Sequence, residues 1–209
     1  MATTPILLDL DGTLVDSVYH HVVAWQDALR AAGHDVPAWR IHAGIGMGSD
    51  RLLPWLLGGH VDGADAIADD HRQRFLDRAE DLRVTDGARE LLEDLGTREV
   101  PFVIATSAGE EERAALLEIL GVEDVPLAGA GGGNDSKPAP DILVAACGQL
   151  GVTPDTAILV GDAPWDARAA RRAGAGAIAV RCGGFGDDVL REAGATSIAD
   201  DPRALIGQL

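Results

Sequence analysis

Four aspartates stand where two short apolar runs end, and their types and spacing suit metal and phosphoryl chemistry. Asp9 and Asp11 close the run PILLDL, and Asp162 and Asp166 follow the run AILV. In an extended strand, residues two apart point to the same face, so Asp9 and Asp11 can serve one site. Crowded carboxylates repel one another unless a cation neutralises them, and a donor set of oxygens without His or Cys suits Mg²⁺. A carboxylate can also attack phosphorus, although spacing alone does not say which of the pair would do so.

The only lysine of the chain adds a positive charge to this set. Of the 17 basic residues, 16 are Arg and one is Lys137, so a composition that avoids Lys has kept it here. Thr106 and Ser107 follow a third apolar run, PFVIA. A lysine ammonium and a threonine hydroxyl can both bind phosphate, and N–H groups at a helix start near Ser107 add donors. These groups would bind an anion locally, whatever the charge of the rest of the surface.

These residues need a scaffold that brings distant segments together, and the apolar runs predict one. Short apolar runs alternate with helical segments from residue 85 onward, which predicts a parallel sheet covered on both faces by helices. Strands are expected at 5–10, 101–105, 124–130, 157–160 and 177–181. Helices are expected at 17–32, 49–57, 64–79, 87–95, 110–120, 138–150, 164–173, 186–193 and 202–208.

The segment from residue 16 to residue 84 carries no strand signal. We therefore predict an α/β core formed by residues 1–15 and 85–209, and an all-helical insert formed by residues 16–84. Ligands of open parallel sheets bind beyond the carboxyl ends of the strands, where the polar residues above stand, so one site is expected there. The run Gly131–Gly133 lacks the ending of a nucleotide-binding loop and is predicted to be a plain loop.

Composition and charge exclude several classes of protein. The 209 residues are 46% hydrophobic and 24% charged, which excludes intrinsic disorder, collagen and coiled coil. The net charge of −17 opposes binding to nucleic acid or to an anionic membrane. Cys147 and Cys182 have no metal-binding spacing and are expected to be free thiols in a reducing compartment. There is no basic region before the first apolar run, and no run approaches the roughly 18 residues of a membrane span, so a cytoplasmic protein is expected.

Taken in chain order, the motifs resemble those of the haloacid dehalogenase superfamily of phosphatases and mutases. Its four motifs are matched by DLDGTLVD from Asp9, by ATS ending at Ser107, by KPAPD from Lys137 and by GDAPWD ending at Asp166. Order and spacing fit across nearly the whole chain, and the first and fourth motifs are the more specific. The resemblance implies a Rossmann-like core, and it implies that residues 16–84 are a helical cap inserted after the first motif.

The resemblance also implies roles for the carboxylates. Asp9 would attack the phosphate, and Asp11 would protonate the leaving group and then activate water on the aspartyl-phosphate. Mg²⁺ would be held by the Asp9 carboxylate, the Asp11 carbonyl oxygen and Asp162. Asp166 would lie nearby, on a metal-bound water or on Lys137.

The phosphate and the leaving group would be held by other residues. The resemblance implies that Thr106 and Lys137 bind the phosphate, and Ser107 is a candidate helix cap or amide donor beside them. In the cap, His21 and Arg51 are candidates for contact with the substrate. A cap that closes over the site would exclude bulk water and select the substrate, a small-molecule phosphate ester.

Three functions remain in competition. A phosphatase acting on a small organic phosphomonoester, as in the phosphoglycolate phosphatase group, is favoured. The alternative is a mutase similar to β-phosphoglucomutase, which has Glu where this chain has Gly161 and a cap arginine where it has Ser49, with Arg51 two residues on. A remote alternative is a signalling domain phosphorylated on Asp, but such receiver domains lack a cap. All histidines fall between residues 20 and 71, which argues against a Ser-His-Asp hydrolase. The oligomeric state is left at monomer or homodimer.

Overall fold

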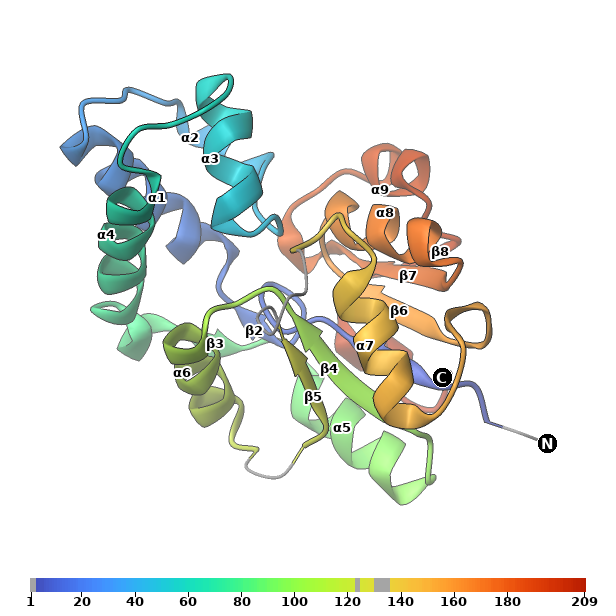
Figure 1. Ribbon diagram of the computed structural model, residues 1–209. Coiled ribbons are helices and arrows are strands. Elements are labelled where there is room, and N and C mark those ends of the chain that lie inside the picture. The colour runs from blue at the N-terminus through green and yellow to red at the C-terminus, as the bar shows by residue number, and fades with distance from the viewer. Residues whose placement is uncertain (1–2, 123–124, 130–135) are drawn as a thin grey trace.

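The core of the protein is a parallel sheet, as the alternation of strands and helices predicts. A computed structural model describes residues 3–122, 125–129 and 136–209. The strands of the main sheet are β1 (Ile6–Leu8), β4 (Phe102–Thr106), β5 (Leu127–Gly129), β6 (Ile158–Gly161), β7 (Gly176–Val180) and β8 (Ser197–Ala199). They form a six-stranded parallel sheet in the order β5-β4-β1-β6-β7-β8 (Figure 1). The first strand therefore lies in the middle, beside the strands that carry the other motifs.

Helices cover both faces of this sheet because the strand residues are apolar on both faces. In β1, Ile6 and Leu8 belong to one hydrophobic cluster and Leu7 to another, as the two-residue period of a strand requires. The first cluster includes residues of α5 (Ala88–Thr97) and α6 (Glu110–Leu120). The second includes residues of α7 (Asp141–Leu150), α8 (Pro164–Ala173) and α9 (Asp187–Ala193). Short 3₁₀ helices lie at Ala79–Asp81, Pro154–Thr156, Arg181–Gly183 and Pro202–Leu205.

The inserted segment forms four helices that lie to one side of the sheet (Figure 1). They are α1 (Val18–Ala31), α2 (Ala38–His42), α3 (Ser49–Leu57) and α4 (Ala64–Leu76). A hydrophobic cluster running from Val18 to Ile67 belongs to these helices and their connections alone. The two ends of the insert pair with each other, through β2 (Val15–Asp16) and β3 (Arg83–Val84), in a two-stranded antiparallel sheet. Among the described residues, no helix combines the length and the apolar character that crossing a membrane requires.

The differences from the predicted elements have local causes. The helix predicted from residue 138 begins at Asp141, because a residue before proline is disfavoured in the helical region and Ala139 precedes Pro140. The segments β2, β3 and β8 were not predicted, since two or three residues are too few to show a period. Of the strand predicted at 124–130, β5 takes Leu127–Gly129. Residues 124 and 130 and the predicted loop Gly131–Gly133 lie outside the described residues.

Candidate active site

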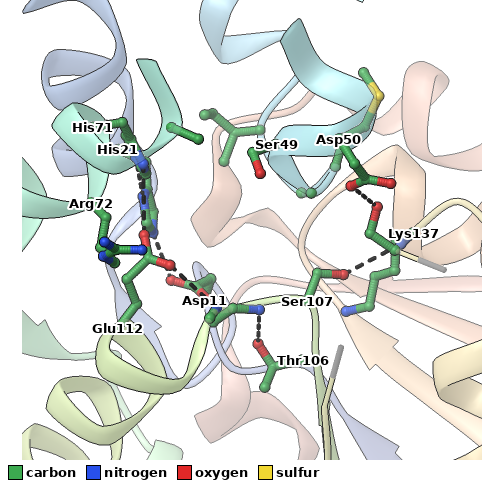
Figure 2. Close-up of a pocket in the computed structure, with 18 of the residues that line it drawn as sticks. Asp11, His21, Ser49, Asp50, His71, Arg72, Thr106, Ser107, Glu112 and Lys137 are labelled. Atoms are coloured by element: carbon green, nitrogen blue, oxygen red, sulfur yellow. Dashed lines mark hydrogen bonds and ion pairs between the residues drawn. The ribbon is translucent and has the colours of Figure 1, made fainter. Parts of the chain in front are cut away.

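A cavity of about 460 Å³ lies between the carboxyl ends of the strands and the inserted helices. Its core side is lined by the residues that follow β1 and β4, by the first turn of α6 and by Ser136 and Lys137. Its other side is lined by residues of α1 and α4 and by the segment from Ile45 to Asp50. Figure 2 shows His21, His71 and Glu112 on one side of the cavity and Asp50, Ser107 and Lys137 on the other. The predicted convergence of polar residues at this edge therefore produces a pocket.

Lys137 lies at the bottom of the site between two carboxylates. Its ammonium contacts the Asp9 carboxylate and lies 2.8 Å from Asp166 Oδ1, and the lysine is only 1% exposed. Burial alone would lower the pKa of Lys137, but Asp166 and Asp9 raise it, so the lysine stays charged. Asp166 also accepts a hydrogen bond from the Ala163 N–H at 3.0 Å, which caps the first turn of α8. Asp166 therefore both caps α8 and pairs with Lys137.

Asp162 completes a group that we call the carboxylate floor, defined as Asp9, Asp162 and Asp166. Carboxylate oxygens of the three residues lie within 4.8 Å of one another, and all three residues are buried. Thr13 Oγ1 donates to Asp162 Oδ1 at 3.0 Å. A side chain at Gly12 or at Gly183 would collide with the Asp162 carboxylate, so glycine is required for this approach.

The carboxylate floor carries more negative charge than Lys137 neutralises. Burial raises the pKa of Asp9 to about 8, although Lys137 opposes the shift, and burial raises the pKa of Asp162 well above its ordinary value. Buried carboxylates with raised pKa values and only oxygen donors fit a small hard cation. The residues present therefore fit Mg²⁺.

Asp11 differs from the floor residues because it faces the inserted helices. Ser17 Oγ donates to Asp11 Oδ1 at 2.8 Å, and His21 Nε2 lies 2.9 Å from the same oxygen. Burial alone would raise the pKa of Asp11, but the bonds from His21 and Ser17 lower it. The same contact raises the pKa of His21 against the effect of its own burial. His21, predicted as a substrate-binding residue, thus contacts a catalytic candidate directly.

His21 belongs to a second group, which we call the histidine wall and define as His21, His71 and Glu112. His21 Nδ1 and His71 Nε2 are 3.1 Å apart, and His71 Nδ1 lies 3.6 Å from Glu112 Oε1 (Figure 2). The aromatic rings of Trp25 and Phe75 stack on the two imidazoles, with ring centroids 3.9 Å apart in each stack. The wall is therefore fixed by packing as well as by polar contacts.

Thr106 is the last residue of β4, and Ser107 follows it. Thr106 Oγ1 accepts a hydrogen bond from the Ala108 N–H at 2.9 Å, which leaves the hydroxyl hydrogen available to a ligand in the cavity. Ser107 Oγ accepts from the Lys137 N–H at 3.3 Å and so helps to hold the segment that carries the lysine. Both residues line the cavity.

The inserted helical segment reaches the core around Gly48. Asp50 Oδ1 accepts a hydrogen bond from Ser136 Oγ at 2.5 Å, and a Cβ on Gly48 would lie 2.5 Å from the Ser136 Cβ. Ser49 and Asp50 line the cavity, but Arg51 is not among its lining residues, and Arg51 Nε lies 3.7 Å from Asp50 Oδ2. The structure therefore brings together all the site residues that were predicted in the α/β core. Arg51, predicted in the insert, lies beside the cavity and does not line it.

Comparison with known proteins decides the family. The family model of haloacid dehalogenase-like hydrolases matches residues 6–174. The chain belongs to the haloacid dehalogenase-like hydrolases. This stretch of the chain contains all four of the motifs and the whole of the inserted helical segment.

Relatives within the haloacid dehalogenase-like hydrolases are named phosphatases. An N-acetylmuramic acid 6-phosphate phosphatase of Pseudomonas aeruginosa is 30% identical, over 100% of this chain and 96% of its own length. A phosphoglycolate phosphatase of Rhodospirillum rubrum is 32% identical, over 94% of this chain and 86% of its own length. The crystal structure of a hydrolase from Pseudomonas syringae has a TM-score of 0.95 and 33% identity, and the match covers 98% of this chain and 97% of that one. With these relatives, this haloacid dehalogenase-like hydrolase is a phosphoric monoester hydrolase.

Several residues that lie at the site could not be singled out from the sequence. Thr13 lies within the first motif, so its place in that motif could have pointed to it. Glu112 stands in the first turn of a helix that follows a motif-bearing strand, which was a weak signal. His71 and Arg72 lie in an amphipathic helix of the insert and gave no signal, although both line the cavity.

Proposed function

We propose that this phosphatase hydrolyses small organic phosphomonoesters with Mg²⁺, through an aspartyl-phosphate on Asp9. The observation that carries the proposal is the pairing of Asp9 with the buried Lys137, at the edge of a cavity that Asp11 also lines. A carboxylate held beside a fixed positive charge can approach a phosphate that would otherwise repel it. The cavity of about 460 Å³ suits a small substrate.

Asp9 and Asp11 divide the chemistry between them in this proposal. An Asp9 oxygen forms a bond to phosphorus while the bond from phosphorus to the ester oxygen breaks, and Asp11 gives that oxygen its proton. Asp11 then takes a proton from water as the water oxygen attacks the aspartyl-phosphate, which releases inorganic phosphate and restores Asp9. Asp11 suits the acid–base role because it faces the cap side, where the leaving group would lie.

The proton on Asp11 depends on its neighbours. The hydrogen bonds from His21 and Ser17 keep the Asp11 pKa low before a substrate binds. A phosphate dianion in the cavity raises that pKa, because a nearby negative charge favours the neutral carboxyl group. His21 holds Asp11 in position during both steps, so it is a positioning residue in this proposal.

The remaining groups hold the phosphate and the metal. Lys137 and Thr106 bind the phosphate oxygens, and the Asp9 carboxylate, the Asp11 carbonyl oxygen and Asp162 would hold Mg²⁺, with Asp166 acting through Lys137. When bound, Mg²⁺ supplies positive charge that neutralises the carboxylate floor and the phosphate. The helices of residues 16–84 act as a cap that shields the reacting groups from bulk water. We place this activity in the cytoplasm.

A sugar-phosphate mutase is the alternative, and two observations at the site bear on it. A side chain at Gly161 would collide with the Asp166 carboxyl group, so the Glu of the mutases does not fit here without displacing Asp166. Arg72 is a cap cation that lines the cavity and could bind a second phosphate, but it is paired with Glu111 at 3.0 Å. The collision at Gly161 weighs against the mutase. A mutase would depend on Arg72 to bind its second phosphate.

The proposal is tested by phosphate release from p-nitrophenyl phosphate, with Mg²⁺ or with EDTA, for the wild type and for Asp9→Asn. We expect turnover that needs Mg²⁺ and a loss on the order of 10⁴-fold in Asp9→Asn, because the nucleophile is removed. Acid-quenched enzyme should carry phosphate on the peptide that contains Asp9, as read by mass spectrometry.

The exposed Asp155 offers a matched control, since Asp155→Asn makes the same chemical change on the surface and should leave turnover unchanged. Equal turnover in EDTA, or activity retained in Asp9→Asn, would contradict the proposal. Phosphate transfer to β-glucose 1-phosphate in place of release to water would favour the mutase.

A further inference from the structure

The histidine wall has the composition of a metal site that differs in kind from the carboxylate floor. Its residues come from three helices, α1, α4 and α6, and each contributes one donor atom to a set that lies within 4.8 Å. His21 and His71 are 9% and 5% exposed, and the Glu112 side chain is 13% exposed. Two imidazoles and one carboxylate form a donor set that zinc takes in proteins, whereas Mg²⁺ prefers oxygen donors alone.

We propose that His21, His71 and Glu112 form a second metal site, for a transition-metal ion such as Zn²⁺, and that an ion bound there inhibits the enzyme. The binding part of this inference stands on the geometry alone. The inhibition part rests on the proposed phosphatase function.

The spacing of the two imidazoles suits an ion as well as a shared proton. His21 Nδ1 and His71 Nε2 are 3.1 Å apart. Two nitrogens that bind one tetrahedral Zn²⁺ at about 2.0–2.1 Å lie about 3.4 Å from each other. An ion can therefore replace the hydrogen bond with a shift of a few tenths of an ångström.

Glu112 would provide the third ligand of the ion from a fixed position. Its Oε2 accepts a hydrogen bond from the Gly109 N–H at 3.2 Å, at the start of α6. Its Oε1 lies 3.6 Å from His71 Nδ1, the ring nitrogen that does not face His21, and one donor atom of each of the three residues lies within 4.8 Å of the others. The Arg72 guanidinium pairs with Glu111 through Nε at 3.0 Å and with Asp69 through Nη2 at 3.0 Å, and its charge also acts on Glu112 by lowering the pKa of that carboxyl.

The fourth position of such an ion would be open to the cavity. All three residues of the histidine wall line the cavity, so a water molecule or a substrate oxygen can complete a tetrahedral set. Ions can therefore enter from the cavity without unfolding any helix.

An ion at His21 Nδ1 would change what the other ring nitrogen does. With Nδ1 bound to a metal, the remaining proton of a neutral imidazole is on Nε2, which lies 2.9 Å from Asp11 Oδ1. The ion would therefore hold the His21 ring, and with it the Asp11 carboxylate, in one orientation. The ion would also tie α1 and α4 of the insert to α6 of the core, and this would slow the opening of the cap.

The test begins with binding. Equilibrium dialysis of the whole protein against Zn²⁺, in Mg²⁺ sufficient to fill the carboxylate site, should give one Zn²⁺ per chain. We expect His71→Gln and Glu112→Gln each to weaken this binding by more than about 100-fold, since losing a direct ligand costs more than losing a residue that only orients one. Co²⁺ at the same site should give the intense visible absorption of a tetrahedral ion with nitrogen ligands.

Two controls separate this site from others. His60→Gln removes an exposed histidine and should leave Zn²⁺ binding unchanged. Asp162→Asn disables the carboxylate floor and should also retain the Zn²⁺. If Asp162→Asn loses the ion while His71→Gln and Glu112→Gln keep it, the ion sits on the floor and the inference is wrong.

Inhibition is measured as the ratio of turnover with and without Zn²⁺ at saturating Mg²⁺. Zn²⁺ should inhibit the wild type but change the turnover of His71→Gln by less than about two-fold, whatever the starting activity of that variant. Inhibition that disappears when Mg²⁺ is raised would show competition at the carboxylate floor and would overturn the inhibition claim. If no phosphomonoester is hydrolysed at all, the proposed function fails, while the dialysis result still decides whether the metal site exists.

Discussion

The carboxylate floor and the histidine wall lie in one candidate active site, and burial affects their titratable groups in opposite ways. Burial raises the pKa values of Asp9 and Asp162 in the floor, because Lys137 does not balance all of its negative charge. In the wall the pKa of His21 is raised by its contact with Asp11, whereas burial and the charge of His21 lower that of His71. The residues of the floor thus fit an added cation, whereas the residues of the wall also contact one another through a hydrogen bond between the two histidines.

The largest effect is expected at Lys137, the cation that pairs with the carboxylate floor. Lys137→Met should lower kcat/KM by about 10²- to 10³-fold, because it removes a fixed charge that faces the phosphate and leaves Asp9 and Asp166 unpaired. The measurement is steady-state hydrolysis of p-nitrophenyl phosphate at saturating Mg²⁺. Arg30→Met removes an exposed cation as a control and should change kcat/KM by less than about two-fold. A loss below ten-fold in Lys137→Met would mean that the metal alone balances the floor.

A smaller effect is expected at the wall. His21→Gln should lower kcat about ten-fold and change KM less, because the glutamine cannot hold Asp11 as the imidazole does. Its neighbour His20 is the control, since its Nδ1 makes no hydrogen bond to any of the described residues, and His20→Gln should change kcat by less than about two-fold. The two variants are compared on the same substrate. Equal losses of kcat in His21→Gln and His20→Gln would show that His21 does not position Asp11.

The smallest effect is on stability, and its sign is the opposite of the effect on activity. In EDTA, Asp162→Asn should raise the melting temperature, because the folded state holds Asp162 with a raised pKa and resists its ionisation. A raised pKa makes the folded state bind more protons than the unfolded state. The wild type therefore loses stability as pH rises above the ordinary Asp pKa of about 3.9, and the loss continues up to the folded-state value.

The expected gain for Asp162→Asn at neutral pH is about 2–4 °C for each kcal/mol relieved, read by thermal denaturation. The gain should shrink toward pH 4, where the unfolded chain also begins to bind the proton. With Mg²⁺ added, the order should reverse, because the wild type alone keeps its metal ligands. A lower melting temperature for the variant in EDTA would show that the hydrogen bond from Thr13 outweighs the burial of charge.

The carboxylate floor could be predicted from the sequence because each of its members stands beside a strand end. Asp9 follows β1, and Asp162 and Asp166 follow β6, where an apolar run stops and polar residues begin. The parallel sheet was predictable for the same reason, since the runs that form β1, β4 and β6 are buried and apolar throughout or nearly so. The pair of strands β2 and β3 could not be predicted, because two residues in each are too few to show a hydrophobic period.

The histidine wall could not be predicted, although His21 itself was a candidate. His21 and His71 are 50 residues apart, and each lies in a helix whose apolar pattern accounts for its fold without them. Whether two helices turn these rings toward each other depends on how α1 packs on α4, which is set by many side chains at once. Glu112 joins them only because α6 of the core lies against α4 of the insert.

The sequence by itself determined the chemistry at the strand ends: which carboxylates, which lysine and which hydroxyl would meet. It could do so because a parallel sheet aligns its carboxyl ends, so a short local pattern fixes a place in space. The tertiary structure alone decided which cap residues face that chemistry, turning His71 toward His21, bringing Asp50 to Ser136 and leaving Arg51 beside the cavity. Helix-to-helix packing has no such local rule, because the orientation of each helix depends on the shape of the whole surface that it covers.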